Sequence, residues 1–280
     1  MSKSLKRQRV KKVEKATHRD KQIVNQQKIN KDKVQKGFVK SITTYRKHAI
    51  VQEAIASRLI AEMRWRCPAH HNSVLEIGCG PAVLTEKYFQ FFNANSYTAN
   101  DIVEEYAPIL EALNPKIQFM GGDIESSDLP QNLDLILSGS TFQWFNDLDT
   151  FLEKCAKALS PNGFLAFSSF GPENYREIRS VNGSGLNYLT YNAHLRLLDK
   201  YFDVIWSEKE IITRHFPEPI GVLHHMKQTG VNGLPGKVWT KSDLKNFEER
   251  YKDLFGTELG VPLSYQPIYF IAKPKIKDKG

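Results

Sequence analysis

The segment Ser73-Val74-Leu75-Glu76-Ile77-Gly78-Cys79-Gly80-Pro81-Ala82 carries the strongest structural signal in the chain. Its apolar residues predict a buried strand, the two glycines interrupt that strand, and the residues from Ala82 to Phe89 then take up helical spacing. A strand, a tight glycine turn and a helix form the first half of a nucleotide-binding βαβ unit. Glycine suits that turn because it bends sharply and lets a ligand lie against the backbone.

Two acidic residues follow at the positions where such a unit uses them. Asn95 to Asp101 is predicted to be a second strand, and its terminal acid stands roughly 20 residues past the glycines, where a carboxylate meets ribose hydroxyls. Lys116 to Met120 is predicted to be a third strand, and Asp123 follows it closely. The three signals together favour a nucleotide ligand over a structural sheet with incidental loop acids.

The rest of the chain completes an alternating pattern of strands and helices. A fourth strand is predicted at 133–138, and the loop after it holds Gln143 and Trp144, which we expect on a substrate-facing side of the ligand crevice. The further predicted elements are a helix at 148–159, a turn at 160–163, a fifth strand at 164–170, a less regular segment to about 200, a sixth strand at 201–212, helices at 217–229 and 242–255, and a closing strand at 264–273. The fold class is therefore α/β, a Rossmann-like doubly wound sheet of about seven strands.

The residues before the first strand divide into two parts. Residues 1–28 are basic, polar and almost free of large apolar side chains, and we expect a disordered extension. From residue 29 to 72, apolar residues recur at three- and four-residue steps and predict two amphipathic helices, with the break between them near Thr43 to His48. We expect these helices to cap the crevice. The remaining domain spans 73–280, with helical cap insertions around 171–200 and 213–240.

Charge and composition exclude several classes of function. Residues 1–50 hold 16 of the 39 basic residues and three of the 31 acidic ones, so the rest of the chain carries a net charge of −5. The positive net charge therefore belongs to the N-terminal part. Residues 1–28 within it contain no aromatic residue for base stacking, which argues against nucleic-acid binding as their role. No apolar run approaches the length of a membrane span. Three cysteines without metal-ligand spacing are typical of a reduced, cytoplasmic compartment.

Metal binding is not expected either. His224 and His225 are adjacent, so on a helix they point to different faces, and no Cys or carboxylate cluster completes a ligand set. We expect no metal and a monomeric protein.

The glycine loop and the two acids resemble the class I S-adenosylmethionine-dependent methyltransferases. The resemblance implies S-adenosyl-L-methionine as cofactor, with the methionine moiety along the E-x-G-x-G loop, the ribose at the second strand's acid and the adenine amine at the acid after the third strand. The implied cofactor-binding residues are Glu76, Gly78, Cys79, Gly80, Asp101, Ile102, Asp123, Ile124 and Ser138. The sequence departs from the family pattern at Ala82, where a third glycine is common.

A narrower likeness lies in the flanking segments. A resemblance to the malonyl-acyl-carrier-protein O-methyltransferases of biotin synthesis is carried by the segment 44–52 (TYRKHAIVQ), Gly122 to Glu125 with Leu129-Pro130, Gln143-Trp144, and the segments 170–178, 226–233 and 262–265. This resemblance spans about Ile29 to Ala272. It implies methylation of the free carboxylate of a malonyl thioester, carried by acyl-carrier protein or coenzyme A. We assign Tyr45 a catalytic role and expect the substrate at Gln143, Trp144, Arg176, Arg179, His225 and Lys227.

Two alternatives stay open at this point. One is another small-molecule methyltransferase on the same fold, because a fold alone does not determine a substrate. The other is a non-catalytic nucleic-acid-binding protein that uses the basic arm and has a degenerate cofactor pocket. The presence of Glu76, Gly78, Gly80, Asp101 and Asp123 argues against degeneracy.

Overall fold

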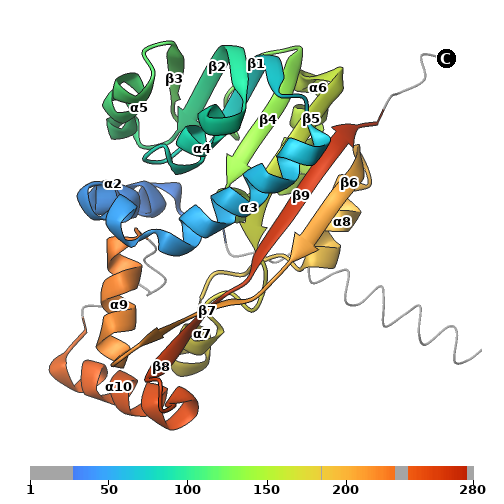
Figure 1. The fold of residues 1–280 in the computed structure, drawn as a ribbon. Coiled ribbons are helices and arrows are strands. Elements are labelled where there is room, and N and C mark those ends of the chain that lie inside the picture. Colours follow the sequence, from blue (N-terminus) through green and yellow to red (C-terminus); the bar gives the residue numbers. More distant parts are fainter. Residues whose placement is uncertain (1–27, 184, 231–238, 276–280) are drawn as a thin grey trace, which may run out of the picture.

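The computed structural model describes residues 28–183, 185–230 and 239–275 and contains a seven-stranded sheet in the order β3-β2-β1-β4-β5-β9-β6 (Figure 1). The strands are β1 His70–Ile77, β2 Asn93–Asp101, β3 Ile117–Gly121, β4 Leu133–Gly139, β5 Leu159–Phe170, β6 Phe202–Lys209 and β9 Pro267–Pro274. The first five are parallel, and β9 is antiparallel to both of its neighbours. The chain order reverses between β1 and β4, which creates a crevice at the carboxyl ends of these strands. The predicted fold class is confirmed.

Helices cover both faces of this sheet because alternate strand residues point to opposite sides. Val74, Leu135 and Phe164 belong to the apolar core shared with α3 (Ile50–Arg66), α4 (Val83–Phe91) and α5 (Ala107–Leu113). The neighbouring residues Leu75 and Ile136 belong to the second core, which α6 (Leu148–Ala158) and α8 (Tyr191–Leu198) cover. Three layers result.

Two strands that the sequence predicts as continuous are each divided in the structure, so that part of the prediction is wrong. The predicted strand at 201–212 corresponds to β6 and to β7 (Ile212–Phe216), and the closing strand at 264–273 corresponds to β8 (Val261–Tyr265) and β9. β7 and β8 pair with each other in a separate two-stranded sheet that extends beyond the main one (Figure 1). An apolar pattern predicts extended backbone, but it does not show at which residue a chain changes its pairing partner.

The prediction of a turn at 160–163 is also wrong, because these residues lie inside β5. Leu133 pairs with Leu159 and Leu135 with Phe164, so the four intervening residues bulge out of the ladder. A Cβ at Gly163 would stand 2.6 Å from the Leu133 carbonyl oxygen, which explains the glycine. The irregular segment after β5 includes the short helix α7 (Arg176–Asn182) as well as α8.

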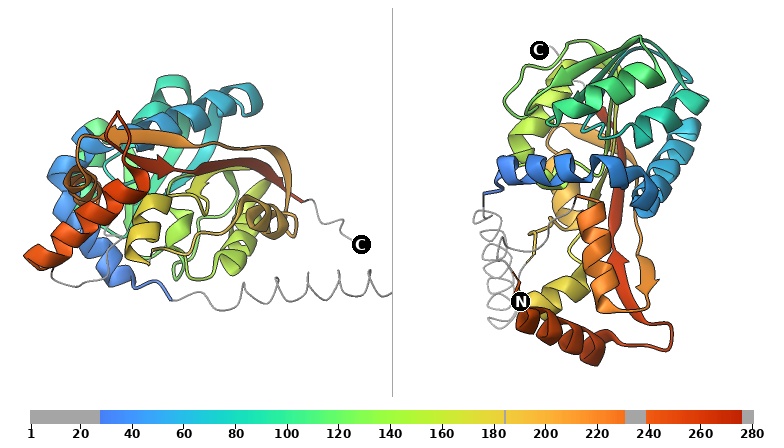
Figure 2. Two further views of the ribbon diagram at one scale, coloured as in Figure 1. Left: turned by 90° about the horizontal axis from the view of Figure 1, so that it is seen from below. Right: turned by 90° about the vertical axis from the view of Figure 1, so that its left-hand side faces the viewer.

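Helix α2 (Lys31–His48) lies across the carboxyl ends of the parallel strands (Figures 1 and 2). The Asn30 side chain caps it by accepting a hydrogen bond from the Lys33 N–H at 2.9 Å, and the break before α3 falls at the buried Ala49. The second view in Figure 2 shows α2 between the main sheet and a group of elements that we call the cap: α7, α9 (Pro219–Gln228), α10 (Lys241–Phe255), β7 and β8. The Thr44 hydroxyl joins α2 to this cap by donating to the Gln228 carbonyl at 3.0 Å.

No helix in the described part of the chain is both long enough and apolar enough to cross a membrane. The predicted basic extension at 1–28 falls almost entirely outside the described residues, which begin at Lys28, so the structure does not test it.

Candidate active site

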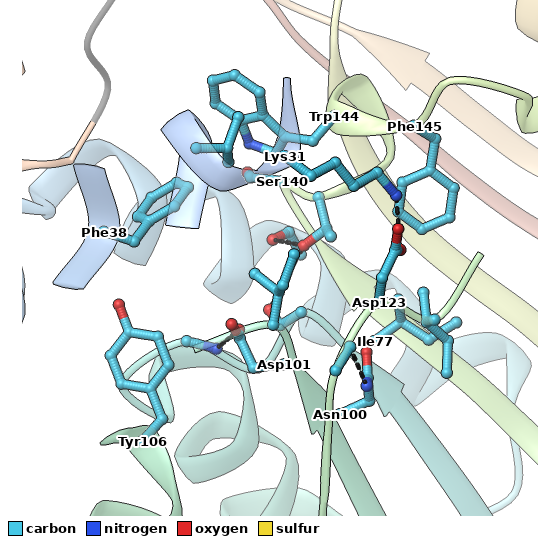
Figure 3. A pocket seen from close by; sticks show the side chains of 18 of the residues that line it. Lys31, Phe38, Ile77, Asn100, Asp101, Tyr106, Asp123, Ser140, Trp144 and Phe145 are labelled. Carbon is cyan, nitrogen blue, oxygen red and sulfur yellow. Dashed lines mark hydrogen bonds and ion pairs between the residues drawn. The ribbon is translucent and has the colours of Figure 1, made fainter. Parts of the chain in front are cut away.

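A pocket of about 720 Å³, partly open to solvent, lies between the carboxyl ends of β1, β2 and β4 and the underside of α2 (Figure 3). Its walls come from segments far apart in sequence. The lining residues are Lys31, Val34, Phe38, Tyr45, Ile77, Gly78, Gly80, Pro81, Asn100, Asp101, Ile102, Tyr106, Gly122, Asp123, Ile124, Gly139, Ser140, Thr141, Trp144 and Phe145. The main sheet thus places its ligand crevice where the strand order predicts it.

The glycine loop after β1 forms the floor of this pocket. Gly78 and Gly80 have φ values of 67° and 50°, in the left-handed region that favours glycine. A Cβ added at Gly80 would meet no atom within 4 Å, so the backbone there faces open space. Ala82 also has a left-handed φ, 66°, and is fully buried at the start of α4. The departure from the family pattern therefore falls at a position that a glycine would occupy with less strain.

Asp101 holds this loop in place. Its Oδ2 accepts a hydrogen bond from the Gly80 N–H at 2.8 Å (Figure 3). Its Oδ1 accepts one from the Val103 N–H at 2.9 Å. Burial raises the pKa of Asp101 to about 6, although these backbone donors act in the opposite direction. Hydroxyl groups that donated to this carboxylate would favour its ionised form. A ribose is a ligand of that kind.

Asp123 lies at the opposite end of the pocket and pairs with a lysine from α2. The Lys31 Nζ stands 2.6 Å from the Asp123 Oδ1 and lies over the Phe145 ring at 5.1 Å from its centroid (Figure 3). It also contacts the Glu125 carboxylate. Next to it, Trp144 packs edge to face against Phe38, with 6.0 Å between ring centroids. The first turns of α2 therefore cover the end of the pocket where Asp123 and Ile124 lie.

One face of α2 supplies this cover. Lys31, Val34, Phe38 and Tyr45 line the pocket, and their spacing places them on the same side of a helix. Burial, followed by the charge of Asp101 and then Tyr265, raises the pKa of the Tyr45 hydroxyl well above its ordinary value. Tyr45 therefore remains protonated at neutral pH, so its hydroxyl can donate a hydrogen bond but cannot serve as a base.

Three predicted cofactor residues lie beside or beneath the pocket. Cys79 is buried and lines a smaller cavity next to the pocket, and the two spaces share residues of the glycine loop. Ser138 is buried, and its hydroxyl donates to the Ile77 carbonyl at 2.9 Å. Glu76 is 1% exposed, and its Oε2 accepts hydrogen bonds from the Thr85 and Tyr97 hydroxyls at 2.6 Å each. The structure thus gives Glu76 and Ser138 contacts that support the loop from below.

Glu76 makes stability depend on pH. Burial raises its pKa to about 7 in the folded chain, from an ordinary value of 4.5. Between these two values the folded state holds a proton that the unfolded state has lost, so stability falls as the pH rises through this range and stays lower above it. We expect Glu76→Gln to raise the free energy of unfolding by about 1–3 kcal/mol at pH 8 and to have little effect at pH 4. Denaturant titrations of both proteins at the two pH values measure this.

The stability of the variant must be compared with that of the wild type at each pH, because Asp101 has a pKa of about 6 and also makes stability depend on pH in this range. The difference between the two proteins isolates the contribution of Glu76. A difference in stability that is the same at both pH values would contradict the assignment of the raised pKa to Glu76.

The structure does not bring the predicted substrate residues together at the cofactor pocket. Of the six residues predicted to bind the substrate, only Trp144 lines this pocket. Gln143 lines an adjoining pocket of about 820 Å³, and its amide donates to the Ser140 carbonyl and accepts from the Ser169 hydroxyl.

The four predicted basic residues lie on the cap, in different surroundings. Arg176 pairs with Glu173 and Glu177, and Arg179 donates to the Pro172 carbonyl. Lys227 is exposed. His225 is 3% exposed, and its Nε2 lies 2.5 Å from the Tyr265 hydroxyl. Burial first, and then the charge of Arg214, lower the pKa of His225 to about 4, so it is neutral at pH 7 and cannot supply a positive charge.

Several pocket residues were missed by sequence reasoning. Asn100 is the clearest case, because its side chain donates to the carbonyls of Met120 and Gly122 at 2.8 and 3.0 Å and so joins the ends of β2 and β3. Its place immediately before Asp101 was a signal that could have been used. Lys31, Phe38, Tyr106 and Thr141 had no such signal, since they reach the pocket only through packing.

Comparisons with known proteins agree with this geometry. Residues 75–167 match a family model described as "Methyltransferase domain". Among solved structures, the YcgJ protein from Bacillus subtilis is similar with a TM-score of 0.55 at 15% identity, covering 79% of this chain and 99% of that one. A coclaurine N-methyltransferase has a TM-score of 0.51 at 17% identity, covering 79% of this chain and 70% of the other. At these identities the likeness concerns the fold alone.

Curated relatives are closer in sequence. The chain is 38% identical over 241 residues to a malonyl-[acyl-carrier protein] O-methyltransferase of Bacteroides fragilis, covering 85% of this chain and 49% of that longer protein. It is also 38% identical over 243 residues to the malonyl-[acyl-carrier protein] O-methyltransferase of Chlorobium luteolum, covering 84% of this chain and 92% of the relative. This identity over almost the whole of a relative shows that the chain belongs to the malonyl-[acyl-carrier protein] O-methyltransferase family of S-adenosylmethionine-dependent methyltransferases.

Proposed function

We propose that this protein methylates the free carboxylate of malonyl-acyl-carrier protein with S-adenosylmethionine, an early step of biotin synthesis. The observation that carries the proposal is the 38% identity to a malonyl-[acyl-carrier protein] O-methyltransferase over 92% of that relative. The pocket beside Asp101 supports it. S-Adenosylmethionine contains a nucleoside, and a doubly wound sheet binds such ligands at the carboxyl ends of its strands.

The residues of the pocket fit S-adenosylmethionine. The backbone at Gly80 faces open space, and the Asp101 carboxylate beside it can accept hydrogen bonds from ribose hydroxyls. Asp123 and Ile124 line the far end, where an adenine ring would lie against Phe145 and Trp144. When bound, this cofactor would supply a methyl group on a positively charged sulfur; transfer to a carboxylate oxygen breaks the bond from sulfur to the methyl carbon and leaves a methyl ester and S-adenosylhomocysteine.

The reaction requires no general acid or base from the protein. A malonyl carboxylate has an ordinary pKa near 4 and is ionised at neutral pH, so no general base is required. The role of the chain is to hold the carboxylate in line with the methyl group and to exclude water, and placement of this kind can contribute about 7–11 kcal/mol. Tyr45 lines the pocket between the glycine loop and the cap, and its protonated hydroxyl can orient the carboxylate.

A positively charged side chain is needed to bind that carboxylate, and we add Arg214 to the candidates predicted from the sequence. Arg214 lies opposite Leu263 in the pairing of β7 with β8, so it shares a face of this sheet with Tyr265, two residues further along β8. Tyr265 in turn influences the pKa of Tyr45 at the pocket. Within the described residues, no carboxylate pairs with Arg214. Arg176, by contrast, already has two acidic partners.

The test of the function compares thioesters that differ only in the carboxylate. Malonyl-acyl-carrier protein should gain one methyl group by mass spectrometry after incubation with S-adenosylmethionine, and acetyl-acyl-carrier protein should gain none because it has no free carboxylate to methylate. Malonyl-coenzyme A, free malonate and RNA serve as parallel acceptors. Transfer to some other acceptor, without a malonyl methyl ester, would leave only the methyltransferase family and overturn the substrate.

The same assay examines the cation. Arg214→Gln should lower kcat/KM for the malonyl thioester roughly 10-fold or more, because the entering carboxylate loses water without gaining a charged partner. Lys227→Gln, on the same cap but at an exposed position, is the matched comparison. The affinity for S-adenosylhomocysteine should stay unchanged in both variants. A larger loss with Lys227→Gln would assign the carboxylate to Lys227 instead.

A further inference from the structure

Gln52 has a buried carboxamide oxygen without a partner. It stands in the first turn of α3, is 8% exposed, and its Oε1 makes no hydrogen bond to any described residue. Most buried polar side-chain atoms are paired, because a buried oxygen that has lost water and gained no donor costs about 1–3 kcal/mol. An unpaired oxygen of this kind indicates a ligand group that is absent from the protein itself.

The oxygen belongs to a residue that lines a cavity of about 390 Å³ next to the main pocket. The two spaces share residues of the glycine loop, Gly78 and Gly80, together with Tyr45 and Ser140. A ligand lying along the glycine loop can therefore extend from one into the other. The remaining walls of the smaller cavity are largely apolar, with Ile55, Ala56 and Leu84 among them.

The cavity also borders the start of α4. Val83 and Leu84, the first two residues of that helix, line it. The first N–H groups of a helix have no acceptor within the helix and favour a carboxylate. The Gln52 oxygen, on the facing helix α3, is an acceptor and favours a positively charged donor. The two groups together match the carboxylate and ammonium groups of an α-amino acid.

We infer that Gln52 binds the α-ammonium group of the methionine moiety of S-adenosylmethionine, through its carboxamide oxygen. The inference rests on the methyl donor and is independent of the malonyl substrate. The nucleoside then occupies the main pocket beside Asp101, and the amino-acid end occupies the smaller cavity between α3 and α4. Gln52 is thus a binding residue that selects the complete cofactor over fragments that lack the amino acid.

The experiment compares two ligands by calorimetry. S-Adenosylhomocysteine carries the α-amino acid, and 5′-methylthioadenosine has the same nucleoside and sulfur without it. Gln52→Met should weaken binding of S-adenosylhomocysteine about 10- to 100-fold, the value of a hydrogen bond to a charged group, and should change binding of methylthioadenosine less than about twofold. Gln52→Glu retains an acceptor oxygen and should keep most of the affinity for S-adenosylhomocysteine.

Gln35→Met is the matched control. The Gln35 amide donates to the Ile102 carbonyl at 2.7 Å, next to the nucleoside end, so this change should affect both ligands by the same factor. Melting temperatures without ligand show that each variant is folded. Equal changes for the two ligands in Gln52→Met, or no change for S-adenosylhomocysteine, would overturn the inference. Failure of the wild type to bind S-adenosylhomocysteine would instead contradict the proposed methyltransferase function.

Discussion

Asp101→Ala should weaken binding of S-adenosylmethionine roughly 100-fold or more, because two hydrogen bonds from ribose hydroxyls to a charged acceptor contribute about 1.5–3 kcal/mol each. The same change removes the acceptor of the Gly80 N–H, which stands 2.8 Å from Asp101 Oδ2, so the glycine loop also loses the contact that positions it. Calorimetric titration with S-adenosylhomocysteine measures the loss. Unchanged affinity would show that the ribose does not lie at the end of β2.

The charge of Asp101 can be tested separately from its shape. Its pKa of about 6 means that roughly one molecule in eleven is ionised at pH 5 and ten in eleven at pH 7. Because ribose donors favour the ionised carboxylate, wild-type affinity should rise up to about tenfold between these pH values. Asp101→Asn keeps one acceptor oxygen and has no proton to lose, so its weaker affinity should not rise in this range. A parallel rise in the variant would assign the pH dependence to another group.

Gly78→Ala adds one methyl group to the glycine loop, and we expect it to reduce both stability and cofactor affinity strongly. The residue has a φ of 67°, and its Cβ would stand 2.8 Å from the Cβ of Thr141, a contact that a rotation of the threonine side chain cannot relieve. Left-handed backbone and overpacking together should lower the free energy of unfolding by about 2–4 kcal/mol. Cofactor affinity should fall as well, because Thr141 and its neighbour Ser140 line the pocket and must shift. Denaturant unfolding and calorimetry report the two effects.

Gly80→Ala tests the effect of backbone strain without the steric clash with Thr141. Its φ is also positive, but a Cβ there meets no protein atom within 4 Å and points into open space. We expect a smaller loss of stability, about 1 kcal/mol, with a clear loss of affinity because the methyl group takes up room that the ligand needs. Adding Thr141→Gly to Gly78→Ala should restore part of the stability. If Gly78→Ala and Gly80→Ala were equally destabilising, the contact with Thr141 would not be the cause.

The parts of the site that sequence reasoning predicted are those encoded by short, continuous segments. Gly78, Gly80, Asp101, Asp123 and Ile124 line the pocket as expected, because each directly follows or ends a strand of the parallel sheet. Parallel strands bring their carboxyl ends to one edge, so a strand-end position in sequence becomes a place in the crevice. The roles assigned to these residues remain predictions until ligand binding is measured.

His225 shows where this reasoning stops. From sequence it was a basic residue near the end of a helix, and the structure buries it against Tyr265 with a pKa of about 4. The position of the residue along the helix could not reveal this environment, because its partner lies on β8, 40 residues away. The division of two predicted strands between the main sheet and the β7-β8 sheet has the same origin, since both parts of each predicted strand have extended backbone.

The sequence by itself determined the α/β class, the glycine turn and the acids at the strand ends, because strand and helix periodicity and glycine's conformational freedom act over a few neighbouring residues. Only the tertiary structure placed Lys31 beside Asp123, Gln52 at the wall of a cavity next to the glycine loop, and Arg214 on the same face as Tyr265. Lys31 is 92 residues from its partner. Contacts of that range depend on how whole helices and sheets pack against one another, and local spacing does not encode which side chains then meet.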